Sequence, residues 1–194
     1  PVSIDGDTAL IGATRANALA GAAYVYVRSG GVWTEQTKLT PSVSEVDDYF
    51  GQAVSVSGDT ALIGASNGLS IGDIGSAYVF VRSGGVWTEQ TELTTSDTAA
   101  RRSFGSAVSV DGNTALIAAR RSTELGGDTG SAFVYVRSGT VWTEQTKLTP
   151  SDGEVDDHFG SDVSLDGDTA LIGAEQDDDN AVGSGSAYIF GCSL

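Results

Sequence analysis

The stretch GSAYVFVRSGGVWTEQTELT, from Gly75 to Thr94, recurs almost unchanged along this chain. Close copies run from Gly21 to Thr40 and from Gly130 to Thr149, and the first half returns from Gly185 to Gly191. Each full copy joins a run of β-branched and aromatic residues to a more polar run through a Gly-containing turn, a pattern typical of a β-hairpin. The chain is therefore expected to be an array of repeated hairpin units.

The second run of each hairpin is expected to form a strand whose side chains alternate between the two faces of a sheet. Strict alternation from Val86 to Leu93 places Trp87 and Leu93 on the same face. Because this run is more polar than the first, it is expected to lie further from the hydrophobic core.

Two shorter apolar segments precede each hairpin. The first contains a Val-Ser pair and the second has the sequence Thr-Ala-Leu-Ile-Gly-Ala or a close variant. Between them stands an Asp-Gly or Ser-Gly turn, a strong signal for a tight hairpin. The valines of the Val-Ser pairs, which are Val2, Val54, Val108 and Val163, are 52, 54 and 55 residues apart. Such a period suits a four-stranded propeller blade and is too long for one coil of a solenoid.

The predicted fold is an all-β propeller of four-stranded antiparallel blades, with about four repeats in 194 residues. The repeats span approximately residues 1–49, 50–103, 104–158 and 159–194 of a single propeller or propeller segment, and the last one lacks its outer strand. No helical period appears, so essentially no helix is expected. The tryptophans at equivalent positions of the first three repeats are expected to pack between adjacent blades; they are Trp33, Trp87 and Trp142.

Three elements that recur in order resemble FG-GAP repeats. They are Phe-Gly before the first strand, at Phe50, Phe104 and Phe159, then Leu-Ile-Gly-Ala in the second strand and Gly-Ser-Ala-Tyr-Val-Phe in the third. The Lys-Leu-Thr-Pro-Ser-Asp segment at 147–152 resembles the bacterial branch of the family. The resemblance implies the β-propeller of integrin α-chains and of many bacterial surface proteins. It further implies an extracellular or cell-surface location and a role in adhesion or as a structural module.

One departure from that family concerns calcium. Calcium-binding members have an Asp-x-Asp-x-Asp-Gly-type loop between the first two strands, whereas this chain has a turn of two or three residues there. The calcium site of the family is therefore not transferred to this chain. A separate calcium site is possible at Asp177, Asp178 and Asp179, because calcium prefers several oxygen ligands, but their spacing matches no established loop. Otherwise no cofactor is expected.

The incomplete fourth repeat leaves the closure of the propeller open between three alternatives. The chain is a segment of a larger ring, or it closes alone as a small four-bladed ring, or neighbouring copies complete one another. Exposed strand edges favour pairing with another chain. The chain begins at Pro1 and contains no Met, so it is expected to be processed or to be part of a longer product.

The composition excludes several classes of function. A formal net charge of -16 repels phosphate backbones, so nucleic-acid binding is not expected. No apolar run approaches the roughly 20 residues of a membrane helix, so membrane insertion is not expected. His158 is the only histidine, and no Ser/His/Asp or Cys/His constellation stands out, so the chain is not expected to be an enzyme.

The loops that vary between repeats all connect the second strand to the third or the fourth to the next repeat. Since adjacent strands alternate in direction, these loops are expected to share one face of the propeller, where binding residues tend to lie. The third repeat places four of the ten basic residues there, namely Arg101, Arg102, Arg120 and Arg121. The plain interpretation is that these loops are only solvated. The sharper hypothesis is a basic patch for an acidic glycan or for an acidic loop of a neighbouring subunit.

Two functions of different class therefore remain. In the first, the chain is a structural or adhesion module that assembles with copies of itself through its incomplete blades. In the second, it is a monomeric propeller that binds a surface protein or glycan on its variable-loop face. The truncated fourth repeat favours the first function.

Overall fold

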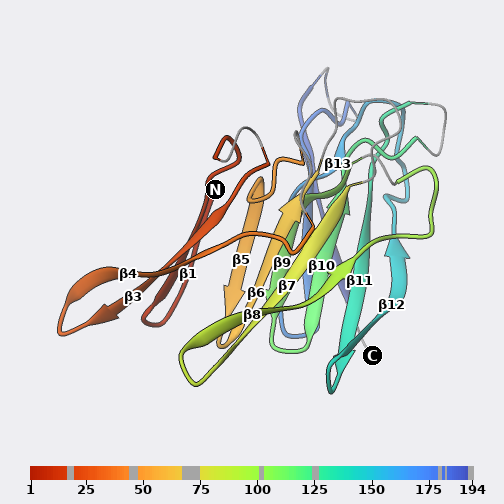
Figure 1. Cartoon of the computed structure of the whole chain (residues 1–194). Helices are drawn as coiled ribbons and strands as arrows, with labels where there is room; N and C mark the ends of the chain where they lie inside the picture. The colour runs from red at the N-terminus through yellow and green to blue at the C-terminus, as the bar shows by residue number, and fades with distance from the viewer. Residues whose placement is uncertain are drawn as a thin grey trace.

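The computed structural model describes residues 1–16, 20–43, 48–66, 75–100, 103–123, 127–178, 181 and 183–191. These residues form fifteen β-strands and no α-helix, which confirms the all-β prediction. The strands make four separate antiparallel sheets, one for each repeat, in which the strand order follows the chain. We call the sheets blades 1 to 4. Figure 1 shows the red blade 1, the orange-to-yellow blade 2 and the green-to-cyan blade 3 in succession, with the blue strands of blade 4 behind the green ones in this view.

The first three blades have four strands each, and blade 4 has three among the described residues. Blade 1 consists of β1 (Val2–Asp5), β2 (Thr8–Gly12), β3 (Ala23–Ser29) and β4 (Val32–Leu39). Blade 2 consists of β5 (Ala53–Ser57), β6 (Thr60–Ala65), β7 (Ser76–Ser83) and β8 (Val86–Leu93). Blade 3 consists of β9 (Phe104–Asp111), β10 (Thr114–Ala119), β11 (Ser131–Ser138) and β12 (Val141–Leu148). Blade 4 consists of β13 (Phe159–Asp166), β14 (Thr169–Ala174) and β15 (Ser186–Gly191).

Glycines set both the turns and the spacing of the blades. In blade 2, Ser57 lies opposite Thr60, so Gly58 and Asp59 form a two-residue turn, and Gly58 takes the positive φ of 56° that such a turn requires. Gly64 has a different role, because a Cβ placed on it would lie 2.1 Å from the carbonyl oxygen of Gly105. The glycine of the Leu-Ile-Gly-Ala segment therefore allows the backbones of blades 2 and 3 to approach closely.

A one-residue bulge interrupts the last two strands of each four-stranded blade. In blade 2, Val79 lies opposite Thr91 while Phe80 lies opposite Glu89, and blades 1 and 3 show the same shift. As a result, Trp87 packs in the core between blades 1 and 2, whereas Leu93 packs in the core between blades 2 and 3. The prediction that these two side chains share a face is wrong, because strict alternation leaves out the extra residue of the bulge.

Each blade has a front face, which is turned toward the next blade in the chain, and a back face, which is turned toward the preceding one. Leu and Ile of the second strand point to opposite faces, so the front-face Leu10 packs in one core with the back-face Ile63. The same arrangement joins Leu62 to the core of Ile117, and Leu116 to the core of Ile172. Three equivalent apolar interfaces thus hold four blades together.

The innermost strands β1, β5, β9 and β13 follow one another around a hollow of about 330 Å³ that residues of all four blades line. The ring is not closed over the described residues. On the back face of blade 1, Val2 is 76% exposed and Ile4 is 65% exposed, and on the front face of blade 4 Ile189 is 75% exposed. Over the described residues the blades therefore form an open arc rather than a closed four-bladed ring.

Candidate binding site

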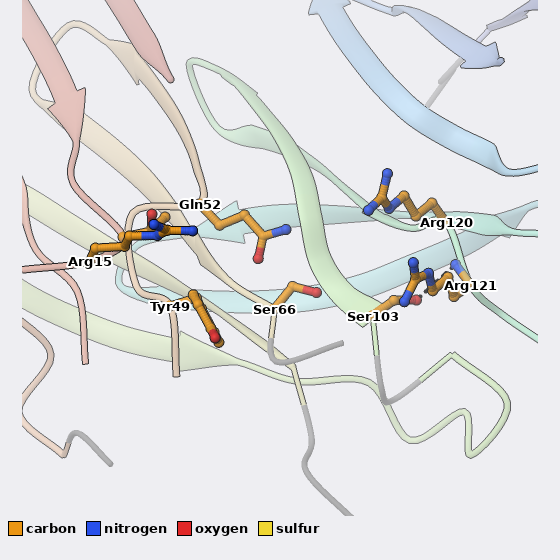
Figure 2. Close-up of a pocket in the computed structure, with 8 residues that line it drawn as sticks. Arg15, Tyr49, Gln52, Ser66, Ser103, Arg120 and Arg121 are labelled. Carbon is orange, nitrogen blue, oxygen red and sulfur yellow. Dashed lines mark hydrogen bonds between the residues drawn. The ribbon is translucent and has the colours of Figure 1, made fainter. Parts of the chain in front are cut away.

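The described structure has a pocket of about 320 Å³ at the end of the arc opposite to the tight hairpin turns (Figure 2). It lies where second strands end and first strands begin, so it belongs to the variable-loop face. Its lining residues are Thr14, Arg15, Tyr49, Gln52, Ser66, Ser103, Arg120 and Arg121.

The strands of three blades position these side chains. Arg120 directly follows β10, Ser66 directly follows β6, and Arg15 lies three residues beyond the end of β2. Because the second strands of successive blades run in the same direction, the segments that follow them meet at one end of the arc. Ser103, which is 2% exposed, lies directly before β9, in the connection between blades 2 and 3, and lines the pocket from there.

Hydrogen bonds fix the third-repeat side of the pocket. The backbone N–H of Arg121 donates to Oγ of Ser103 at 2.9 Å, which ties the segment before β9 to the segment after β10. The backbone N–H of Arg120 donates to Oγ of Ser106 at 3.2 Å. The structure thus brings Arg120 and Arg121 to the place where the sequence predicted a basic patch. Arg101 and Arg102, which belong to the same prediction, lie outside the described residues.

The charge of the pocket is opposite to that of the chain. Of the eight described residues that line it, three are arginines and none is acidic, whereas the whole chain has a formal net charge of -16. Carboxylates lie on the blade 4 side, where Nη1 of Arg120 is 3.7 Å from Oε1 of Glu175 and Nε of Arg121 is 3.7 Å from Oδ2 of Asp128. These separations are longer than direct hydrogen bonds, so the ion pair of Arg120 with Glu175 is loose.

Sequence reasoning missed Arg15 as a member of this site. Its position after the second strand of repeat 1 is equivalent to that of Arg121 in repeat 3, and Thr14 corresponds to Arg120. Superposing the repeats gives the signal that was needed, namely basic residues at the same position of two blades that flank a common hollow.

The predicted calcium ligands show a different arrangement. Asp177 is 2% exposed and its Oδ2 accepts a hydrogen bond of 2.7 Å from the hydroxyl of Tyr188. Burial and the hydrogen bonds to Asp177 and Asp152 raise the pKa of Tyr188, so its hydroxyl remains a donor at neutral pH. Oδ1 of Asp178 accepts from the backbone N–H of Gly183. Asp179 lies outside the described residues, within which no group of three His, Cys, Asp or Glu side chains is arranged to hold a metal ion; calcium binding stays a prediction.

Five of the six predicted structural residues lie between blades. The prediction is wrong for Trp33, which is 36% exposed, because no blade precedes blade 1 in the structure to cover it. Phe50, Phe104 and Phe159 are 0% exposed, and each ring meets an aromatic ring of the third strand of its own blade edge-on, at 5.4, 5.5 and 5.3 Å between centroids. Nε1 of Trp87 donates to the side-chain oxygen of Gln36 in the preceding blade at 3.0 Å. Trp142 makes the same contact with Gln90 at 2.9 Å.

A family model described as FG-GAP repeat matches this chain over residues 33–80, 87–135 and 142–190. The chain belongs to the FG-GAP repeat family. Each matched span runs from the tryptophan of one blade into the third strand of the next, so it crosses one of the three blade interfaces. FG-GAP repeats commonly bind ligands or mediate protein interactions, and they are typical of extracellular or surface proteins.

Solved structures of other proteins are similar to this FG-GAP chain, and the propeller of TolB shares its fold. TolB from Acinetobacter baumannii matches with a TM-score of 0.51 and 15% identity, covering 98% of this chain and 43% of TolB. A GH43 endo-arabinanase from Bacillus licheniformis matches with a TM-score of 0.46 and 10% identity, over 98% of this chain and 71% of the enzyme. PorZ, a surface component of the type-IX secretion system of Porphyromonas gingivalis, matches with a TM-score of 0.39 and 17% identity, over 98% of this chain and 20% of PorZ.

The FG-GAP chain thus spans less than half of the length of TolB. No curated protein sequence matches it. In the part that the structure describes, no helix is long and apolar enough to cross a membrane.

Proposed function

We propose that this FG-GAP chain is an extracellular or cell-surface structural module whose copies join head to tail through the open faces of the arc. One observation supports this most strongly: the back face of blade 1 and the front face of blade 4 are the two halves of an interface that the chain already forms three times. The proposed role is assembly or adhesion, without catalysis or nucleic-acid binding.

The apolar parts of the two open faces match the buried ones. Val2, Ile4 and Ile11 of blade 1 occupy the positions of Val54, Val56 and Ile63, which are at most 8% exposed in blade 2. On blade 4, Leu171 is 45% exposed, although its equivalents Leu10, Leu62 and Leu116 are at most 1% exposed. Joining the faces of two copies would remove these side chains from water, which is the main favourable term in most protein association.

A hydrogen bond from a backbone N–H to a serine side chain repeats at each interface and extends the match to polar groups. In each internal interface, Oγ of the serine in the Val-Ser pair of one blade is the acceptor. The donor is a backbone N–H of the next blade, two residues after the valine of its own Val-Ser pair. The three pairs are Ser3 with Val56 at 3.1 Å, Ser55 with Val110 at 3.0 Å and Ser109 with Leu165 at 3.0 Å. Continuing the series, exposed Ser164 would accept from Ile4 of the next copy.

Hydrogen bonds made by the tight turns and by the third strands also recur from one interface to the next. The backbone N–H of Gly58 donates to Asp5 at 2.6 Å, and that of Gly167 donates to Asp111 at 2.8 Å, so Asp166 would accept from Gly6 of the next copy. Nη1 of Arg82 donates to Thr8 at 2.9 Å, and Nη1 of Arg137 donates to Thr60 at 3.0 Å. Across the proposed interface, the equivalent pair is Thr169 on blade 4 of one copy and Arg28 on blade 1 of the next. Thr169 is exposed in the single chain.

The front face of blade 4 also has a hollow of about 170 Å³ lined by Leu171, Ser164 and Ala187 among others. It is suited to an apolar side chain such as Val2 of a second copy. Asp162 departs from the pattern, because Ala53 and Ala107 occupy its equivalent positions in blades 2 and 3. This exposed carboxylate weakens the joint relative to the internal interfaces, since burying a charge is costly.

The native mass of the chain in solution, measured by light scattering over a range of concentrations, tests this proposal. The unmodified chain is expected to form species larger than 19.8 kDa. Ile11→Asp on the back face of blade 1 and Leu171→Asp on the front face of blade 4 should each reduce association. Val86→Asp is the matched control, since Val86 is 63% exposed on the outer strand of blade 2 and belongs to neither open face.

Thermal unfolding of each variant confirms that the blades stay folded. A chain that remains a monomer at every concentration, or association that the two face variants leave unchanged, would contradict the proposal. The pocket on the variable-loop face favours a second function, ligand binding, which does not depend on association.

A further inference from the structure

We propose that the pocket lined by Arg15 and Arg120 binds the carboxylated sugar unit of an acidic glycan, such as a uronic acid. This site lies at the loop end of the blades and is separate from the open faces, so the inference does not rest on head-to-tail assembly. It names a ligand chemistry for a site that the fold alone leaves unassigned.

The arginines account for the carboxylate. Figure 2 shows Arg15 on one side of the pocket, Arg120 and Arg121 on the other, and Gln52 and Ser66 between them. Among the described residues Arg15 forms no ion pair, and Arg120 lies 3.7 Å from its carboxylate partner, so both guanidinium groups have N–H donors to offer. A planar guanidinium matches the two oxygens of a carboxylate, and such charge-assisted hydrogen bonds are the strong ones.

The other lining groups account for the sugar. Thr14, Ser66, Ser103 and Gln52 present hydroxyl and amide groups, which both donate and accept hydrogen bonds. A ligand rich in hydroxyls satisfies such groups, whereas a simple inorganic anion only accepts. The volume of about 320 Å³ is at the small end of ligand pockets and suits one sugar unit rather than a folded partner.

An acidic peptide would need a different surface. Extended peptides pair along an exposed strand edge or lie in a groove, where rows of backbone groups are available. This pocket instead lies beyond the ends of β6 and β10, where the hydrogen bonding between neighbouring strands has ended. The geometry therefore favours the end or a side unit of a glycan over an acidic loop of a protein.

The negative charge of the rest of the chain restricts where an acidic ligand can bind. The chain has 26 acidic and 10 basic residues, so an acidic ligand is repelled by most of its surface. Binding of such a ligand is then expected at this pocket, where three arginines line the wall and none of the described lining residues is acidic.

The test uses isothermal titration of the intact chain with a galacturonic acid disaccharide, with the neutral galactose disaccharide, with a glutamate-rich peptide and with sulfate. The acidic disaccharide is expected to bind, and the neutral one is not. Arg15→Gln and Arg120→Gln should each weaken that binding about tenfold or more, because each removes a charge-assisted hydrogen bond.

Arg28→Gln is the matched control, because it makes the same charge change beside Asp7 at the opposite end of a blade. Its binding should equal that of the unmodified chain, and thermal unfolding should show all three variants folded. Equal binding of the neutral disaccharide, equal binding of sulfate, binding of the peptide alone, or no binding of the acidic disaccharide would each overturn the inference. Equal weakening by Arg28→Gln would also overturn it, since the effect would then be one of net charge.

Discussion

Trp33 and Trp87 stand in the same local sequence, Gly-Gly-Val-Trp-Thr-Glu-Gln-Thr, but in different surroundings. Trp87 is 8% exposed and donates a hydrogen bond to Gln36 of the preceding blade, with the guanidinium carbon of Arg82 5.0 Å from its ring centroid. Trp33 lies on the open back face of blade 1 and is 36% exposed. The difference comes from the neighbouring blade and not from the local sequence.

This contrast predicts different costs for the same substitution. Trp87→Ala should lower the free energy of unfolding by roughly 3–5 kcal/mol, because it leaves a cavity in the core between blades 1 and 2. Trp33→Ala should cost less than about 2 kcal/mol in dilute solution, where the open face has no partner. Denaturant unfolding of both variants measures the two values. A loss below about 1 kcal/mol for Trp87→Ala, or equal losses for the two, would contradict the packing described here.

Single residues also show where sequence reasoning ends. The patterns of Ile63, Leu62 and their equivalents suffice to predict buried strands, because alternation of side chains is a local property. Burial of a particular copy is not local: Leu62 is buried and Leu171 is exposed in nearly the same sequence. The presence of a following blade decides the outcome, and no pattern within the strand contains that information.

At the scale of elements, polar links reinforce the apolar contacts between blades. Nζ of Lys147 on β12 lies 2.6 Å from Oδ2 of Asp97, which belongs to the connection after β8. Partial burial opposes ionisation of Asp97, but the hydrogen bond from Lys147 and those from backbone N–H groups outweigh it and lower the pKa of Asp97 below 3.8. This ion pair therefore joins blade 2 to blade 3 while the carboxylate is charged.

The sign of the pKa shift predicts a pH dependence. Since the pKa of Asp97 is lower in the folded state, the stabilisation is fully present above the ordinary pKa of 3.8 and is lost as the pH falls through the folded value. Asp97→Asn should cost about 1–2 kcal/mol at pH 7. The difference from the unmodified chain should shrink as the pH falls from 3.8 toward 2.

Thermal unfolding of both proteins between pH 7 and pH 2 checks this result. Asp168→Asn provides the control, because Asp168 lies in an exposed turn and the equivalent turn of blade 3 has Asn113 in its place. A difference between Asp97→Asn and the unmodified chain that stays constant down to pH 2 would contradict the assignment.

The elements themselves were predictable, and two features of them were not. The repeat period and the Asp-Gly turns suffice to predict the four sheets, their strand order and the shared loop face. The bulge at Gln90 has no signal in a strictly alternating pattern, so the predicted face of Leu93 is wrong. Arg15 has a sequence signal, since it aligns with Arg121 when the repeats are superposed. That the two positions line one pocket depends on the packing of the blades, which no single repeat contains.

At the scale of the whole molecule, the arc has two unlike open faces, which we propose to join head to tail. The fold agrees with the sequence prediction, and the family model agrees with the resemblance found in the Phe-Gly and Leu-Ile-Gly-Ala segments. The curvature of the arc could not be predicted from one sequence, because it depends on the angle between blades at each interface. In the proposed assembly, the contact between copies would be heterologous and head to tail, and the angle between blades would decide whether it forms rings or filaments.

Mixing two variants with opposite faces blocked tests this account most directly. The Ile11→Asp copy keeps its front face of blade 4, and the Leu171→Asp copy keeps its back face of blade 1, so one copy of each should form a single joint and stop. Light scattering of the equimolar mixture should give a heterodimer of twice 19.8 kDa, while each variant alone stays at 19.8 kDa. A mixture that remains monomeric, or variants that dimerise equally well alone, would contradict head-to-tail assembly.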